Sequence, residues 1–146
     1  MALFDGKKAA PPKITKAIDP KWAKSAKGSF NRLLHFDPDE ANIRGVGGVY
    51  IIWHGGVKTA WVYADASPDL ARSINEAADN EEITEYEVNG RLFVSWSPVL
   101  EDYRRGVVLF LTQSLKTQVV NPLAPTEETD DTYLIPVLLP GEQPKA

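Results

Sequence analysis

Two tyrosines on either side of a glycine turn are the residues of this chain best placed to do chemistry. Tyr50 lies in the run GVYIIW and Tyr63 in the run TAWVYA, and the connection HGGVK joins the two runs. A phenol can transfer a proton, and a hairpin closed at the paired glycines would fix the distance between two such groups. The pair is open to three interpretations: catalysis, a surface for a ligand or partner, and packing of the sheet, which strand aromatics commonly provide.

Other residues suited to chemistry are sparse in the 146 residues. The sequence contains no Cys and two His, which excludes disulfides, thiolate metal ligands and cysteine nucleophiles and argues against a histidine-rich metal site. His54, beside the glycine turn, is expected on an exposed loop. Trp53 and Trp61 flank the same turn, where they would form a cross-strand pair or, alternatively, a platform on which a nucleic-acid base stacks.

The elements that would position these residues follow from local patterns. The two runs predict an antiparallel hairpin, because both are rich in β-branched and aromatic residues and the glycines supply the positive φ values of a tight turn. A helix should follow, with Ser67 as N-cap and Pro68 at its first position, and it should end near Asn80. Its apolar stripe would consist of Leu70, Ile74, Ala77 and Ala78.

Two further segments would complete the sheet and its helices. Residues 85–88 (EYEV), the turn Asn89-Gly90 and the run RLFVSWSPV predict a second hairpin, or an edge strand followed by a central one. The run LEDYRRGVVLFLTQSL predicts a helix, because its aromatic and apolar residues recur at helical intervals, although its middle, GVVLFL, would equally suit a strand. The tail from Asn121 is rich in Pro and acidic residues, and its apolar run YLIPVLL predicts an extended segment docked on the body.

Charge is distributed unevenly along the chain. Residues 1–35 hold eight cations and two anions, about +6, whereas the remainder holds eight cations and eighteen anions, about −10, for a net charge of −4. Residues 1–20 combine three prolines with lysines and alanines, which predicts a flexible basic arm. The acidic run at 79–87 is expected to be a solvated face. One amphipathic basic helix is predicted beyond Pro20 from the helical spacing of Trp22, Ala26, Phe30, Leu33 and Leu34.

These patterns predict an α+β fold with a flexible basic arm at 1–20, a single α+β domain at 21–122 and an acidic, Pro-rich tail at 123–146. No signal-peptide core or membrane-length apolar run is present, so we expect a cytoplasmic protein without a membrane span. The basic segment would bind nucleic acid, be ordered by an acidic protein surface, or remain a solvated tail. The residues expected to contact such a partner are Lys13, Lys16, Lys21, Lys24, Lys27, Arg32, Trp53 and Trp61.

Residues 45–122 resemble the GIY-YIG nuclease family. The resemblance is carried by GVY at 48–50, WVY at 61–63, SPDLAR at 67–72 and VVNP at 119–122. It implies a small three-stranded antiparallel sheet flanked by helices. In family terms the chemistry is phosphodiester hydrolysis with one divalent metal ion held by a helix Glu, and with two tyrosines and an Arg around the scissile phosphate. Tyr50 and Tyr63 fall on the family tyrosines, whose phenols would orient or deprotonate the attacking water.

Three positions of the family pattern are not matched in this sequence. Asp65 stands where the second motif has a glycine, so a carboxylate would lie near the negatively charged phosphate. The family Arg falls on Ser73, and Arg72, one residue earlier, would point about 100° away on a helix. The metal-binding Glu falls near residues 108–109, in the apolar run GVVLFL, and Glu101 lies nearly two turns before it.

These departures predict a catalytically inactive GIY-YIG-like domain that acts as a protein-binding or adaptor module and needs no metal or other cofactor. Two alternatives stay open: a metal-dependent DNA endonuclease with displaced catalytic residues, and a DNA-binding protein that does not cleave. An active enzyme would take a divalent metal such as Mg²⁺. Its catalytic residues would be Tyr50, Tyr63, Arg72 and Glu101, with Arg104 or Arg105 as displaced cations.

Overall fold

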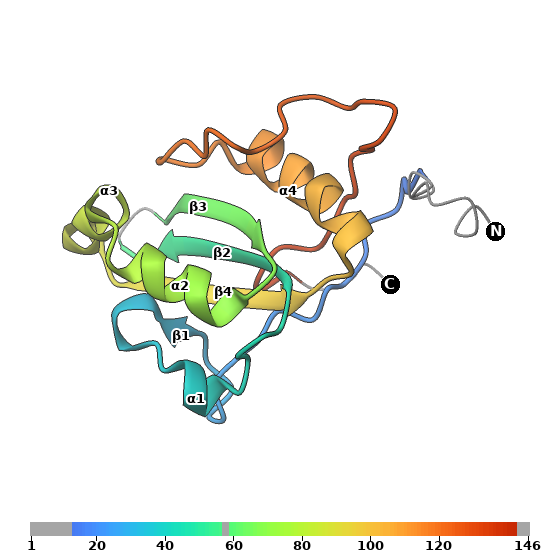
Figure 1. Ribbon diagram of the computed structural model, residues 1–146. Coiled ribbons are helices and arrows are strands. Elements are labelled where there is room, and N and C mark those ends of the chain that lie inside the picture. Colours follow the sequence, from blue (N-terminus) through green and yellow to red (C-terminus); the bar gives the residue numbers. More distant parts are fainter. Residues whose placement is uncertain (1–12, 57–58, 143–146) are drawn as a thin grey trace.

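The computed structural model describes residues 13–56 and 59–142, which form an α+β fold around an antiparallel sheet. The strands are β1 (Asn31–Arg32), β2 (Gly48–His54), β3 (Ala60–Ser67) and β4 (Leu92–Pro98), in the spatial order β1-β4-β2-β3 (Figure 1). The α-helices are α1 (Pro38–Ala41), α2 (Leu70–Ala78), α3 (Glu81–Thr84) and α4 (Glu101–Leu115), and the 3-10 helices are η2 (Leu33–His35) and η3 (Glu85–Asn89). The predicted α+β class is confirmed, whereas the sheet has four strands in place of the expected three.

β2 and β3 form the predicted hairpin, and β2 pairs on both sides, with β3 and with β4. Their register places Tyr50 opposite Asp65 and Ile52 opposite Tyr63. All seven residues of β2 are buried, because β3 and β4 pair with its two sides and helices cover both faces. A Cβ at Gly48 would overlap the backbone of β4, so the first residue of the strand must be a glycine for the two strands to approach this closely.

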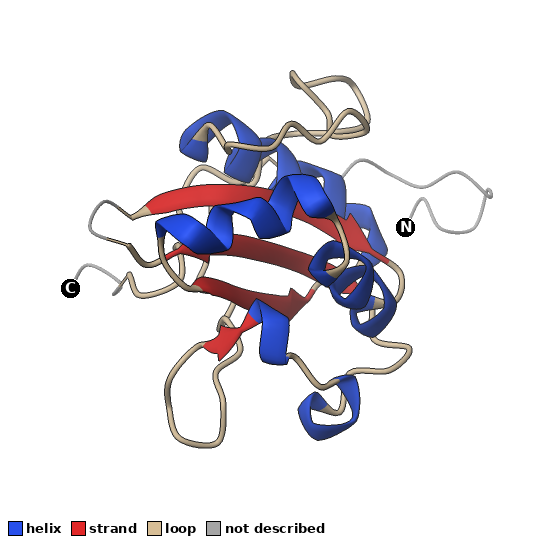
Figure 2. Cartoon of the chain, turned by 90° about the vertical axis from the view of Figure 1, so that its left-hand side faces the viewer, coloured by secondary structure: helices blue, strands red, loops and turns tan. Residues whose placement is uncertain are grey.

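The alternating side chains of β2 divide the core into two layers. Tyr50 and Ile52 belong to one layer, in which α2, α3 and η2 cover the sheet. Val49, Ile51 and Trp53 belong to the other, in which α4 and the segment near residue 135 cover it. Figure 1 shows α2 and α4 on opposite sides of the strands, and Figure 2 shows helices both in front of the strands and behind them.

The prediction of an amphipathic basic helix beyond Pro20 is wrong. Residues 20–32, here called the basic edge segment, run in an irregular extended path along the outer edge of β4 and include β1. The amide of Ala23 donates to the carbonyl of Trp96 at 2.9 Å, and the hydroxyl of Ser95 donates to the carbonyl of Ala23 at 2.7 Å. The segment pairs with β4 and does not form the helix that its apolar spacing predicts. A helix would leave the backbone groups on the outer edge of β4 without partners.

Left-handed residues also interrupt any helix in this segment. Lys21 has a φ of 58° and Gly28 a φ of 82°. Gly28 is part of a turn that is closed by hydrogen bonds between Ser25 and Ser29, in which the Ser25 amide donates to the Ser29 carbonyl at 2.7 Å. The apolar residues at helical spacing are used differently, since Trp22 enters the α4 layer and Leu33 enters the α2 layer.

The strand predicted for residues 85–88 is also absent, because this stretch continues the helical path of α3 into η3. Asn80 caps α3 by accepting from the amide of Glu82 at 2.9 Å. Gly90, with a φ of 148°, then turns the chain into β4. Glu87 holds this corner, since its carboxylate accepts from the amide of Leu92 at 2.7 Å and from the Arg32 guanidinium at 2.9 Å. The Asn-Gly turn therefore joins a helix to a strand and not two strands.

The helix predicted from LEDYRRGVVLFLTQSL is confirmed as α4, and the tail docks on it. The amide of Ile135 donates to the carbonyl of Gly106 at 3.1 Å, and a Cβ at Gly106 would overlap the carbonyl oxygen of Tyr133. Ile135 and Val137 are buried, which confirms the expected docked apolar segment. Within residues 13–56 and 59–142, no helix is both long and apolar enough to cross a bilayer.

Residues 13–20, expected to belong to a flexible arm, lie beside the C-terminal segment. Ile18 forms a parallel bridge with Val137, in which its amide donates to the Pro136 carbonyl at 3.0 Å and its carbonyl accepts from the Leu138 amide at 2.9 Å. In Figure 1 the blue and red ends of the described chain run side by side behind the sheet. The other residues of the expected arm, 1–12, lie outside the described part.

Candidate functional site

The hairpin brings the two tyrosines together on the α2 side of the sheet. The ring centroids of Tyr50 and Tyr63 are 6.2 Å apart and their planes are tilted by 42°. Tyr50 is 4% exposed, because β2 is interior, whereas Tyr63 on β3 is half-buried. One phenol is therefore part of the core, and the other lies at its border with solvent.

Burial and a neighbouring carboxylate keep both phenols protonated. Burial raises the pKa of Tyr50 well above its usual value, and the negative charge of Asp65 raises it further. Burial and the Asp65 charge raise the pKa of Tyr63 to about 12. A phenol with a raised pKa is harder to deprotonate and is a poor general base at neutral pH. The carboxylate at position 65, in place of a motif glycine, thus acts against the chemistry that the resemblance implies.

The cation nearest to the family pattern pairs with a carboxylate of its own helix. Arg72 Nε donates to Glu76 Oε1 at 3.1 Å along the exposed face of α2, where the two side chains are 79% and 68% exposed. Position 73, on which the family Arg would fall, carries a serine whose hydroxyl donates to the Ser67 hydroxyl at 2.6 Å. Ser67 also accepts from the amide of Asp69 at 2.9 Å, so this cluster fixes the turn between β3 and α2.

This turn also differs from the predicted helix start. Asp69, not Ser67, is the N-cap residue of α2, because Ser67 is still the last residue of β3. The Ser67 hydroxyl forms a local turn with the Asp69 amide, which delays the helix by two residues. Of the predicted apolar stripe, Leu70, Ile74 and Ala77 are buried, and Ala71 joins them.

The metal site implied by the resemblance does not fit the residues present. Val108 and Leu109 are buried apolar residues of α4, which covers the sheet face opposite to the two tyrosines. Glu101 is exposed in the first turn of the same helix. Within the described residues, no group of three or more His, Asp or Glu side chains could hold a metal ion. We therefore derive no catalytic step through a metal.

The two other displaced cations have different surroundings. Arg104 Nε donates to the carbonyl of Val99 at 2.7 Å, and its guanidinium lies against the backbone of Gly47, where a Cβ would overlap it. Arg104 is thus used to hold the start of α4 beside the start of β2. Arg105 is exposed on α4.

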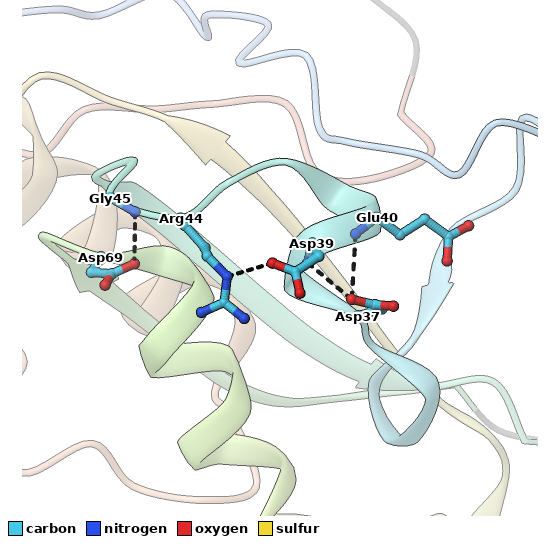
Figure 3. A network of polar contacts seen from close by, with 6 residues as sticks. All are labelled: Asp37, Asp39, Glu40, Arg44, Gly45 and Asp69. Atoms are coloured by element: carbon cyan, nitrogen blue, oxygen red, sulfur yellow. Dashed lines mark hydrogen bonds and ion pairs between the residues drawn. The ribbon is translucent and has the colours of Figure 1, made fainter.

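A network of carboxylates around Arg44 lies at the start of β2 (Figure 3). Asp37 caps α1 by accepting from the amides of Asp39 and Glu40, and Asp69 accepts from the amide of Gly45 at 3.1 Å. Arg44 forms an exposed ion pair with Asp39, which lowers the pKa of that carboxyl and raises the pKa of the guanidinium. The network connects α1, the loop before β2 and the start of α2, and we read it as structural.

The lysines predicted to bind a partner are exposed, and the basic edge segment carries three of them. Lys21, Lys24 and Lys27 lie on this segment, and the Lys24 ammonium is 5.2 Å from the centroid of the Phe30 ring. Arg32 is less available because it pairs with Glu87. Lys13 and Lys16 lie earlier in the chain and are also exposed.

Trp53 and Trp61 face each other across the hairpin, with ring centroids 5.6 Å apart. Trp53 is buried among Phe30, Phe93 and Trp61, so it cannot serve as an open platform. Trp61 is half-buried and borders a cavity at the turn end of the hairpin.

Two polar residues have roles that the sequence analysis missed. His54 was expected on an exposed loop, but it is the last residue of the interior strand β2 and is 6% exposed. Asn121 is buried, where its amide donates to the Ala64 carbonyl at 3.2 Å and its Oδ1 accepts from the Leu123 amide at 3.1 Å. The position of His54 directly after the apolar run GVYIIW was the available signal for its burial.

Comparison of the chain with protein-family models, with curated proteins and with solved structures finds no match.

Proposed function

We propose that the chain is a GIY-YIG-like domain without nuclease chemistry that acts as a protein-binding or adaptor module. The proposal of inactivity is supported by the surroundings of the two tyrosines. Their neighbours are carboxylates, their pKa values are raised, and the nearest guanidinium of the pattern pairs with Glu76. A transition state with developing negative charge would find no cation there to stabilise it.

The observation that carries the binding function is the basic edge segment. Lys21, Lys24 and Lys27 are exposed, and no acidic residue lies between positions 20 and 32. Hydrogen bonds from Ser95 and Ser97 of β4 hold the backbone that carries these lysines. A partner therefore meets positive charges on an ordered backbone, so less conformational entropy is lost on binding than with a free tail. The partner that this surface fits is a protein with an acidic face.

The structure also decides how the binding function must be tested. Deleting residues 1–35 would remove Trp22 and Leu33 from the core and uncover β4. The better test replaces Lys21, Lys24 and Lys27 together by Gln, with the matched triple replacement by Arg as the control that keeps the charge. We expect affinity purification from the host to recover a specific partner with the wild type and the Arg variant but not with the Gln variant. Recovery of the same partner with all three proteins would contradict the proposal.

Nuclease inactivity needs its own experiment. We expect no cleavage of supercoiled or branched DNA by the purified protein in the presence of Mg²⁺ or Mn²⁺. Cleavage that disappears in the double variant Tyr50→Phe, Tyr63→Phe would instead support the displaced-residue endonuclease.

DNA binding without cleavage is the second candidate, because the same three lysines could contact phosphates. It predicts binding that weakens steeply with salt and is lost in the Gln variant but kept in the Arg variant. A DNA titration at two salt concentrations distinguishes this function from recognition of an acidic protein.

A further inference from the structure

We propose that a cavity at the turn end of the β2–β3 hairpin binds a small molecule that combines a planar ring with one anionic group. The cavity has a volume of about 640 Å³, which is within the range of small-molecule sites in proteins. It lies where the end of β2, the start of β3, η3 and the C-terminal end of α4 meet. The residues that carry the argument are His54, Trp61, Tyr86, Asn89, Lys116 and Gln118.

Aromatic rings give this cavity flat walls. Trp61 is half-buried at its border, and the rings of His54 and Tyr86 are parallel to within 8°, with centroids 6.4 Å apart. Flat aromatic surfaces favour a planar ligand, because rings gain most contact when they stack. The side-chain amides of Asn89 and Gln118 add donors and acceptors that suit the edge of a heterocycle.

His54 is the second and independent observation. The residue is more than nine-tenths buried, and its Nδ1 has no hydrogen-bond partner within the described residues. Buried polar atoms without partners are uncommon and costly in folded proteins. His54 lines the cavity, so a ligand bound there supplies a hydrogen-bond partner to its imidazole.

The charge of the residues that line the cavity favours an anionic ligand. Among the described residues that line the cavity, Lys116 is the one with a formal charge at neutral pH, and no carboxylate is present. This differs from the rest of the chain beyond residue 35, which holds eighteen anions and eight cations. Lys116 is exposed at the C-cap of α4, so its ammonium is free to reach a phosphate or carboxylate at the mouth.

A mononucleotide and an aromatic carboxylate share this chemistry, and calorimetric titrations separate them. The probes are adenosine 5′-monophosphate and indole-3-acetate, with adenosine and ribose 5-phosphate as the partial ligands. We expect at least one of the two ring-bearing anions to bind, and its affinity to exceed that of both partial ligands. Failure of both ring-bearing anions to bind would overturn the proposal, as would equally tight binding of adenosine or ribose 5-phosphate.

Variants then locate the site. Lys116→Gln should weaken binding of the preferred probe about tenfold, equivalent to about 1.4 kcal/mol, whereas Arg105→Gln at the other end of α4 should not. In NMR titrations, the ring of His54 and the indole of Trp61 should shift, while the exposed His35 serves as the internal reference. An equal loss of affinity in both variants, or shifts at His35 without shifts at His54, would overturn the assignment. This site is separate from the basic edge segment, so its failure leaves the proposed function intact.

Discussion

The indole Nε1 of Trp22 donates a hydrogen bond to the carbonyl oxygen of Leu138 at 2.7 Å, which ties the segment before the sheet to the segment after α4. Trp22→Phe keeps most of the buried ring but removes this bond. We expect the free energy of unfolding to fall by about 1 kcal/mol, measured by chemical denaturation. Ile18→Ala is the control: it leaves the backbone bonds of the same bridge in place and should cost less. A larger loss from Ile18→Ala would show that side-chain burial, not the indole bond, holds the two segments.

Variants of Tyr50 and Tyr63 test whether the two side chains serve packing or chemistry. Tyr50→Phe and Tyr63→Phe should melt close to the wild type and retain partner binding, because the rings stay in place. Tyr50→Ala should destabilise the fold by about 3–5 kcal/mol, since it opens a cavity beside the interior strand. Tyr63→Ala should cost less because that ring is half-exposed. If the Phe variants stay folded but lose binding or activity, the hydroxyls are functional and the packing interpretation is wrong.

High pH should destabilise the protein through the same residues. The pKa of Tyr63 is raised to about 12 in the folded chain, above the value of about 10 for an unperturbed tyrosine. The folded state therefore keeps a proton that the unfolded state has already released, and the stability from this group, intact below pH 10, is lost as pH rises toward 12. Denaturant titrations at pH 9 and pH 11 should show this loss. The loss should be smaller in Tyr63→Phe, and an unchanged pH dependence would contradict the assignment.

The serine at the position of the family Arg has a structural role that can be measured. Ser73→Ala removes the hydrogen bond to the buried Ser67, and we expect a loss of about 1 kcal/mol in the free energy of unfolding. The neighbouring exposed residue Asn75 supplies the matched control, because Asn75→Ala touches no buried contact. Equal effects from the two variants would mean that the Ser67–Ser73 bond contributes nothing.

Gly106 should not tolerate a side chain, although it lies in the middle of a helix. Gly→Ala in a helix interior is normally favourable by up to about 1 kcal/mol. Here the added Cβ would overlap the carbonyl of Tyr133, so we expect Gly106→Ala to be destabilising by about 1–3 kcal/mol. The exposed neighbouring variant Arg105→Ala should be close to neutral. A stabilised Gly106→Ala would show that the C-terminal segment does not dock as described.

Elements with strong local signals could be predicted from the sequence. The β2–β3 hairpin follows from its glycine turn between β-branched runs, and α4 follows from helical periodicity over four turns. Residues 20–32 could not be read in this way, because the edge of a distant strand decides their conformation and overrides apolar spacing. Residues 85–88 look like a strand by composition, but Asn80 starts a helical path that carries through them.

The candidate site was predictable only in part. Tyr50 and Tyr63 are expected to be neighbours because a hairpin pairs the two strands that carry them. The carboxylate of Asp65 can also be read directly from the sequence. The burial of His54 was indicated by its place directly after GVYIIW, but its stacking on Tyr86 was not, because that contact depends on η3 covering the end of the hairpin. The cavity there is formed by three segments that are distant in sequence, so no local pattern could indicate it.

The pairing along the outer edge of β4 constrains the order in which the chain can fold. β2, β3, α2 and β4 follow one another along the chain and can assemble as they leave the ribosome. The basic edge segment is synthesised before them but must wait for β4, and Ile18 must wait for Val137, near the end of the described chain. Such non-local pairings slow folding, so the outer edge of β4 stays open to other chains until the basic edge segment has paired with it. The α4 layer of the core therefore stays partly uncovered until the segment that carries Ile135 and Val137 has been made.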